Sequence, residues 1–259
     1  MFTYYAAAAA ALLRVATATD VFAHFMVQNA YAYDVGQWKK DIASAQQIGI
    51  DGFALNWIPP DCVGGLGWTV DRIADAFTAA EATGFKLIYS FDMSYSTCNV
   101  YWNQTFMGDM ISKYSGSSAT YRWNNNILVS TYGGDQVTEY GNEFFQGLKN
   151  NLQGSNAITL VPALTTYSMA AASQGGDAAS SASKMLSDYS SIDGVFNWQA
   201  WPLNVEQNIS TTTDEAFQSA LKGSGRSGPY MMCKSCNGAR TLACALTVSQ
   251  LCLPGSTRT

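Results

Sequence analysis

A unit that recurs along the chain constrains the fold more than any other feature of the sequence. Each unit is a short apolar run rich in β-branched and aromatic residues, then a polar loop, then an amphipathic stretch that ends near a glycine. Six such runs begin roughly 30 to 40 residues apart, which is typical of βα units. They are Val21 to Val27, Gly52 to Trp57, Lys86 to Asp92, Ile127 to Tyr132, Ile158 to Leu164 and Gly194 to Trp201, and a seventh begins at Pro229.

The stretch after the first run shows how each predicted helix would pack. Trp38, Ile42 and Ala45 recur at helical spacing, Asp34 can cap the start, and Gly49 sits where a left-handed C-cap belongs. Near-continuous apolar strands predict a parallel sheet covered by helices. No glycine-rich phosphate-binding turn follows the first strand, as a doubly wound nucleotide-binding sheet would require. The sequence therefore predicts an α/β fold of the (β/α)8 TIM-type barrel, incomplete here, with about six to seven βα units.

The charge balance argues against nucleic acid and membrane partners. The chain has 14 Lys and Arg against 19 Asp and Glu, which gives a net charge of -5 at pH 7. Aromatic residues make up 13%, which suits stacking on uncharged sugar rings, although the same rings would also serve in a core. We expect a neutral carbohydrate partner and a monomer.

The first 18 residues have the pattern of a secretory signal peptide. The apolar run Ala6 to Leu13 precedes Ala16-Thr17-Ala18, a small-residue cleavage pattern, although Arg14 interrupts the stretch and no basic residue precedes it. We therefore expect secretion to the cell exterior or cell wall. Two sequons, Asn103-Gln104-Thr105 and Asn208-Ile209-Ser210, are compatible with glycosylation there.

Polar and aromatic residues gather near the carboxyl ends of the predicted strands, where barrel enzymes place their sites. Each has a structural interpretation as well: a hydrogen-bonded core histidine, aspartates that cap loops, and tryptophans that pack in the core. Taken together, they predict a sugar-binding cleft lined by His24, Asn56, Trp57, Asp92, Asp135, Trp198 and Trp201.

Glycosidases need two carboxyl groups that face each other across the scissile bond. Asp92 and Asp135 are the strand-end pair that position alone nominates. They would follow neighbouring strands, but the sequence does not fix their separation, and capping roles stay open for both.

The six cysteines fall into two groups. Cys62 and Cys98 follow neighbouring strands and are a candidate disulfide in an exported protein. The other four open with a CxxC, which also suggests a zinc module, but no histidine lies nearby and we expect no metal. These four are Cys233, Cys236, Cys244 and Cys252.

Six blocks in order resemble glycoside hydrolase family 71, the fungal α-1,3-glucanases also called mutanases. The blocks are VFAHFMVQN, GIDGFALNW, KLIYSFDMS, ILVSTYGGD, LVPAL and DGVFNWQAWP, and the resemblance covers roughly Val21 to Met232. It implies a (β/α)8 domain that hydrolyses α-1,3-linked glucan with inversion and without a cofactor, in cell-wall remodelling or degradation. A noncatalytic α-glucan-binding pseudoenzyme is the alternative.

The resemblance stops at Cys233. The family pattern leads us to expect a further aromatic-rich region and a final strand with a Trp-Asn-Asp and Glu-Ser type motif, which would carry the catalytic Asp and Glu. Residues 233–259 instead contain no aromatic and no acidic residue. We expect a partial barrel over 19–232, then an aberrant, disordered tail such as a gene-model error would produce. The catalytic pair would then be missing, and open strand edges would lower stability.

Overall fold

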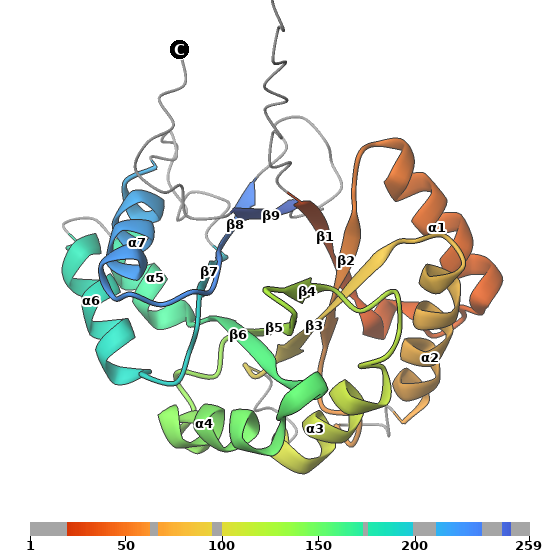
Figure 1. Ribbon diagram of the computed structural model, residues 1–259, viewed down its shortest axis with the longest axis horizontal. Coiled ribbons are helices and arrows are strands. Elements are labelled where there is room, and N and C mark those ends of the chain that lie inside the picture. Colours follow the sequence, from red (N-terminus) through yellow and green to blue (C-terminus); the bar gives the residue numbers. More distant parts are fainter. Residues whose placement is uncertain are drawn as a thin grey trace, which may run out of the picture.

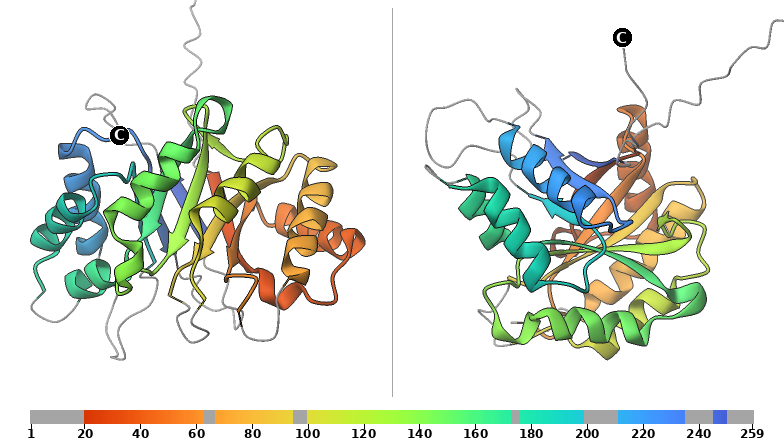
Figure 2. Two further views of the ribbon diagram at one scale, coloured as in Figure 1. Left: turned by 90° about the horizontal axis from the view of Figure 1, so that it is seen from below. Right: turned by 60° about the vertical axis from the view of Figure 1, so that its left-hand side comes forward.

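Parallel strands surround a central axis, and helices form an outer layer around them (Figure 1). This computed structural model describes residues 20–62, 67–94, 100–172, 176–198, 211–234 and 245–249. Within these ranges, no helix is both long and apolar enough to cross a membrane. The first helices, in orange, and the last, in blue, lie on opposite sides of the strands (Figure 2).

The predicted barrel strands are confirmed, with small differences at their ends. Parallel strand pairing links β1 to β2, β2 to β3, β3 to β5, β5 to β6, and β7 to β8. The sixth predicted run, Gly194 to Trp201, is shorter in the structure, because the strand β7 ends at Asn197. The strands are β1 (Asp20–Met26), β2 (Gly52–Trp57), β3 (Lys86–Asp92), β5 (Asn126–Tyr132), β6 (Ile158–Ala163), β7 (Val195–Asn197) and β8 (Tyr230–Lys234).

Helices follow the strands as the repeat predicts. The first, α1, begins where the Asp34 side chain accepts a hydrogen bond from the amide of Gln37, and Gly49 has the left-handed φ of 81° that the C-cap prediction required. The helices are α1 (Val35–Gln47), α2 (Trp68–Glu81), α3 (Gln104–Lys113), α4 (Asn142–Asn151), α5 (Thr165–Ala172), α6 (Ala178–Asp188) and α7 (Thr212–Gly223). Short 3-10 turns are η1 (Val27–Ala30), η2 (Thr138–Tyr140) and η3 (Gly154–Asn156).

The C-terminal segment contributes one strand that the sequence does not predict. β9 (Ala245–Ser249) lies between β1 and β8 and pairs with both in antiparallel fashion. A (β/α)8 barrel has a parallel eighth strand at this place. The free N–H and C=O groups of the two strand edges accept any extended segment, and ALTVS has the β-branched residues that suit one. The rest of the segment, 235–244 and 250–259, lies outside the described residues.

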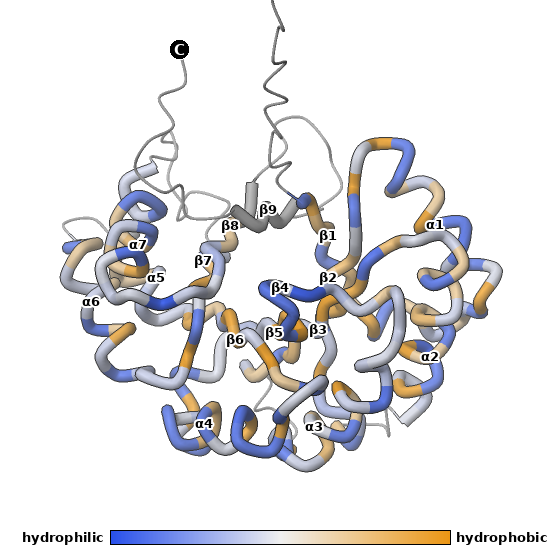
Figure 3. The backbone as a smooth tube through the Cα atoms, viewed as in Figure 1, coloured by the Kyte–Doolittle hydropathy of each residue, from blue (hydrophilic) through white to orange (hydrophobic). Residues whose placement is uncertain are grey.

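Alternation along the strands produces two cores. Odd and even residues of a strand point to opposite faces, so one set fills the barrel and the other packs under the helices. Figure 3 shows hydrophobic stretches along β1, β3 and β6, whereas the helices alternate between hydrophobic and hydrophilic stretches. The interior set includes Phe22, Ala54, Ile88, Leu128, Val161, Phe196 and Met231.

The amino end of the barrel is plugged. β4 (Arg122–Trp123) pairs antiparallel with β5 and is drawn across the centre of the ring in Figure 1. Beside it, the Tyr121 hydroxyl donates to Asp20 at 2.6 Å, and the Trp123 indole donates to the carbonyl of Ser227 at 2.9 Å. These bonds reach from β5 across the ring to β1 and to the residues before β8, so the plug covers the amino end and leaves the carboxyl end as the approach for a ligand.

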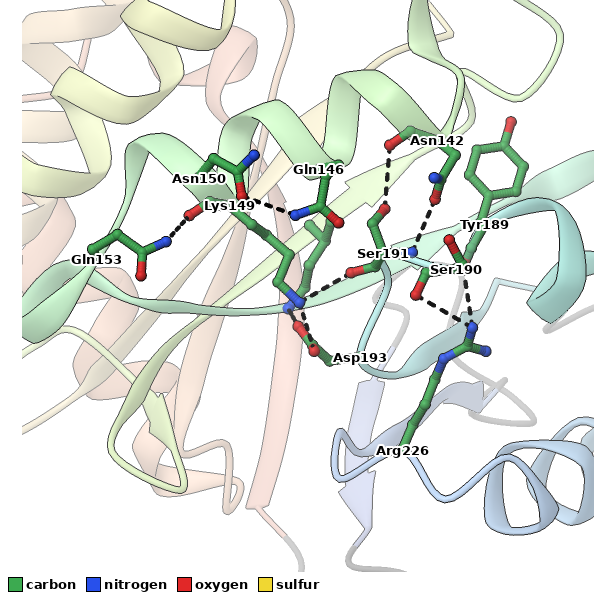
Figure 4. A network of polar contacts seen from close by, with 11 residues as sticks. Asn142, Gln146, Lys149, Asn150, Gln153, Tyr189, Ser190, Ser191, Asp193 and Arg226 are labelled. Atoms are coloured by element: carbon green, nitrogen blue, oxygen red, sulfur yellow. Dashed lines mark hydrogen bonds and ion pairs between the residues drawn. The ribbon is translucent and has the colours of Figure 1, made fainter.

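A polar network at the entry to β7 holds the strand in place (Figure 4). One carboxylate oxygen of Asp193 accepts from the Lys149 ammonium at 2.7 Å, and the other accepts from the Leu160 amide at 2.8 Å. The Lys149 ammonium also donates to the carbonyl of Ser191 at 3.0 Å. The side chain of Arg226 donates to the carbonyl of Leu186 at 2.8 Å, close to the end of α6.

Replacing Asp193 by Ala is expected to destabilise the protein by about 2 to 3 kcal/mol. The change removes an ion pair whose members are only about a quarter exposed, and it leaves the Leu160 amide without its side-chain acceptor. Urea unfolding of Asp193→Ala and of Lys149→Met provides the measurement. Lys149→Met, which keeps the bond to Leu160, should cost less, and an equal cost would contradict the role given to that bond.

Candidate active site

Five interior side chains meet at the carboxyl ends of the strands, and we call this group the mouth. Each of the five follows a residue of the barrel interior by two or four positions along the chain. Because side chains alternate between the two faces of a strand, an even spacing directs each of them inward as well. The register places Tyr132 opposite Asp92, whereas His24 lies opposite Ala54, one alternate position before Asn56. The mouth consists of His24, Asn56, Asp92, Tyr132 and Trp198.

Trp198 is the centre of the mouth. Its ring centroid lies 4.0 Å from that of His24 and 4.4 Å from that of Tyr132, with interplanar angles of 54° and 56°. Trp198 follows β7, whereas His24 and Tyr132 come from β1 and β5. The indole therefore joins strands from three parts of the ring, and its half-buried position leaves part of its surface to a ligand.

The His24 imidazole is neutral. Both ring nitrogens are buried, although the residue as a whole is only partly buried, and this burial lowers its pKa from 6.5 to about 3, because the imidazolium ion would lose its hydration. Among the described residues neither ring nitrogen has a hydrogen-bond partner. A neutral ring offers one donor and one acceptor, so His24 can hydrogen-bond to a sugar hydroxyl but does not carry a proton for catalysis at neutral pH.

Further polar atoms line the same layer. Asn56 and Ser90 are fully buried, and in the described part of the chain the Asn56 amide and the Ser90 hydroxyl find no protein partner. Ser130 differs, since its hydroxyl donates to the carbonyl of Val161 at 2.9 Å. Leaving polar groups unpaired in a core costs stability, so these atoms are open to a hydrogen bond from a water molecule or a ligand.

Asp92 is the buried carboxyl group of the mouth. It is 7% exposed, and one of its oxygens accepts from the amide and the hydroxyl of Ser94, at 3.0 and 2.6 Å. Burial raises its pKa, and the bonds to Ser94 oppose that rise only in part. Tyr132 lies opposite Asp92 in the register of β3 and β5, and burial raises the pKa of Tyr132, as do the negative charges of Asp92 and then Asp135.

Asp135 is engaged by the neighbouring helix. Its carboxylate accepts from the amides of Thr165 and Thr166, at 3.1 and 2.7 Å, and from both threonine hydroxyls. These two threonines begin α5, so the contacts are those of a helix cap. The sequence leaves open a cap on the loop that follows Asp135, whereas the structure uses this residue at the start of a helix 30 positions later, and both of its oxygens are occupied there.

The structure places Trp57 differently from the sequence prediction. Neighbouring residues on a strand point to opposite faces, so Asn56 and Trp57 cannot both face the barrel interior. Trp57 is fully buried under the helices, where its indole donates to Thr69 at 2.8 Å and its ring lies 5.3 Å from that of Trp102. It is a core residue, and the prediction that it lines the cleft is corrected.

Several other predictions fall wholly or partly on residues that are not described. Trp201 and the second sequon, Asn208, lie in 199–210, and Cys98 lies in 95–99. Cys62 is buried and disulfide-bonded, and its pairing with Cys98 stays a prediction. Nothing is described of the side chains of the four C-terminal cysteines.

Tyr132 is the mouth residue that sequence reasoning misses. It is the last residue of β5, and alternation from the interior residue Leu128 through Ser130 directs it inward. The alternation of the strand itself thus carries the signal for Tyr132, three residues before Asp135.

A parallel barrel with a buried carboxyl group and aromatic rings at its carboxyl mouth is an arrangement that suits glycoside hydrolases. One solved structure, described as a glycoside hydrolase-like protein, has this fold, with a TM-score of 0.54 and 13% identity over 81% of this chain and 68% of that one. The sequence profile described as glycosyl hydrolase family 71 matches residues 17–238. The chain belongs to this family.

Curated relatives carry more specific names. The glucan endo-1,3-alpha-glucosidase agn1 of Schizosaccharomyces pombe is 29% identical over 80% of this chain. The mutanase Pc12g07500 of Penicillium rubens is 31% identical over 78% of it. The chain spans only 44% and 40% of the lengths of these two proteins.

Proposed function

We propose that the barrel binds α-1,3-glucan and acts as a glucan endo-1,3-α-glucosidase of the mutanase type. Membership of the family supports the glycosidase class, and the names of the two relatives support the linkage. The observation that carries the proposal is the mouth itself, where Trp198 and Tyr132 present rings beside the buried carboxyl group of Asp92. An uncharged sugar needs stacking surfaces and hydrogen bonds, and this group supplies both.

Each mouth residue has a role in this proposal. Trp198 stacks on a glucose ring, while His24 and Asn56 hydrogen-bond to its hydroxyls. Asp92 stays protonated to higher pH than an exposed aspartate, so it suits the general acid that protonates the leaving oxygen. An inverting hydrolase also needs a carboxylate base on the opposite side of the ring to activate water. Among the described residues, Asp135 is the nominated candidate, and it must first leave its threonine partners.

The engagement of Asp135 favours a second candidate, glucan binding without hydrolysis. With both oxygens of Asp135 bonded to α5, the described part of the mouth holds one buried acid and no free base beside it. A cleft can keep its rings and hydrogen-bonding groups without the second carboxylate. Such a chain would retain glucan and release no sugar.

We further propose that the protein acts outside the cell or in the cell wall, as a monomer. The disulfide at Cys62 supports an oxidising compartment, because cytosolic thiols are kept reduced. The Asn103 side chain, part of the first sequon, is exposed, and its oxygen caps α3 by accepting from the amides of Thr105 and Phe106. The amide nitrogen remains available to carry a glycan.

The test is release of reducing sugar from insoluble α-1,3-glucan, measured beside retention of the protein on the same polymer. We expect retention on α-1,3-glucan and none on β-1,3-glucan. Hydrolysis that falls by about a hundredfold or more in Asp92→Asn would establish the enzyme and its acid. Retention without hydrolysis would establish the binding protein instead. A chain that neither binds nor cleaves the polymer would overturn both candidates.

A further inference from the structure

We infer that the protein has a second glucan-binding site outside the barrel, beside the mouth. A cavity of about 650 Å³ lies between the first turns of α2 and α3, next to the residues that follow β2. Its walls include Pro59, Asp61, Tyr101, Trp102, Phe106 and Asp109. The inference rests on the proposed function for the identity of the sugar, and on the cavity for the site itself.

One wall of the cavity is held by the turn after β2. The amide of Cys62 donates to the carbonyl of Pro59 at 3.0 Å, which closes a tight turn that contains Pro60 and Asp61. Cys62 is buried and disulfide-bonded, so the end of this turn is covalently anchored. Two prolines and a disulfide leave the wall little conformational freedom, and little entropy is lost when a ligand binds to it.

The opposite wall is held by buried hydrogen bonds. The Trp102 amide donates to the Tyr140 hydroxyl at 2.5 Å, and the Trp102 indole donates to the backbone carbonyl of Asp92 at 2.8 Å. The neighbouring ring of Tyr101 lies edge-on to Tyr140, with centroids 6.0 Å apart. Tyr101 is nevertheless 40% exposed, although it lies beside the buried residues Trp102 and Tyr140.

The chemistry of the walls suits a neutral polyhydroxylated ring. The exposed Tyr101 ring offers a face for stacking, and the carboxylates of Asp61 and Asp109, both on exposed residues, accept hydrogen bonds from hydroxyl groups. Two carboxylates repel an anionic ligand, and the net charge of -5 adds to this repulsion. A glucose unit satisfies these conditions, whereas a phosphorylated or acidic sugar does not.

The cavity is next to the mouth. Trp102 forms part of the cavity wall and at the same time bonds to Asp92, the buried acid of the mouth. The bond is made to the backbone carbonyl of Asp92, so Trp102 links the cavity wall to the end of β3, and in this inference one polysaccharide chain occupies both places. Linked occupancy raises the affinity for a long polymer far more than for a short oligosaccharide.

The experiment compares polymer and oligosaccharide binding in matched variants. For Tyr101→Ala, and for Asp61→Asn combined with Asp109→Asn, we expect at least about a fivefold loss of affinity for insoluble α-1,3-glucan. Affinity for a soluble α-1,3-linked trisaccharide, measured by calorimetry, should change by less than about twofold, because the mouth is intact. Tyr31→Ala and Glu81→Ala are the controls, since both residues are exposed and neither lines the cavity.

The outcomes separate this inference from the proposed function. Wild-type affinity for the polymer in Tyr101→Ala would overturn the second site and leave the proposed function standing. An equal loss in Tyr31→Ala would also overturn it, because the effect would not belong to the cavity. If the wild-type protein binds neither α-1,3-glucan nor the trisaccharide, the proposed function fails and the inference falls with it. Thermal melts of each variant exclude loss of folding as the cause.

Discussion

Lowering the pH from 7 to 4 is expected to reduce the free energy of unfolding by about 3 kcal/mol through His24 alone. In the folded protein the pKa of His24 is lowered from 6.5 to about 3 by burial. An unfolded histidine titrates near its ordinary value, so between these two pKa values the unfolded chain binds a proton that the folded chain does not. Stability is therefore complete above the unfolded pKa and is lost as the pH falls toward the folded one.

The chain permits a clean measurement because His24 is its only histidine. Urea unfolding of the wild type and of His24→Phe at pH 7 and pH 4 gives four free energies. The phenyl ring fits beside Phe196, whose centroid lies 5.5 Å from that of the imidazole, and it does not titrate. Titration of the carboxyl groups is common to both proteins and cancels in the difference. A difference between wild type and variant that stays the same at both pH values would contradict a buried neutral imidazole.

The strands were predictable because their signal is local. A strand buried on both faces reads as an apolar run, and six runs separated by amphipathic stretches leave few folds to choose from. β9 was not predictable in this way. Its residues form a strand by pairing with β1 and β8. This pairing depends on the unpaired edges of those two strands more than on the sequence of the segment.

The mouth was predictable at the level of strand ends but not at the level of side-chain direction. Asn56 and Trp57 both end β2, and only the pleat of the strand separates a residue of the mouth from one under the helices. Counting alternate positions from the interior residue Ala54 would have separated them, and the same count from Leu128 would have found Tyr132. The partnership of Asp135 with Thr165 and Thr166 joins residues about 30 positions apart, so no local pattern reveals it.

Replacing Trp57 and Trp198 one at a time is expected to separate stability from sugar binding. Trp57→Ala removes a fully buried ring packed among Phe91, Trp102 and Phe106, and should cost about 3 to 5 kcal/mol of stability. Trp198 is half-buried at the mouth, so Trp198→Ala should cost less stability and reduce affinity for α-1,3-glucan by about tenfold or more.

Affinity is measured on folded protein, at a temperature below the melting transition of every variant. Trp123→Ala is the matched control, since Trp123 is also half-buried and tied to the ring but lies at the plugged amino end. Its loss should leave glucan affinity unchanged. If Trp198→Ala and Trp123→Ala weaken binding equally, the effect comes from a loosened barrel and not from a stacking ring. If Trp57→Ala is as stable as the wild type, the assignment of that ring to the helix-facing core is wrong, and the cleft must be redrawn to include it.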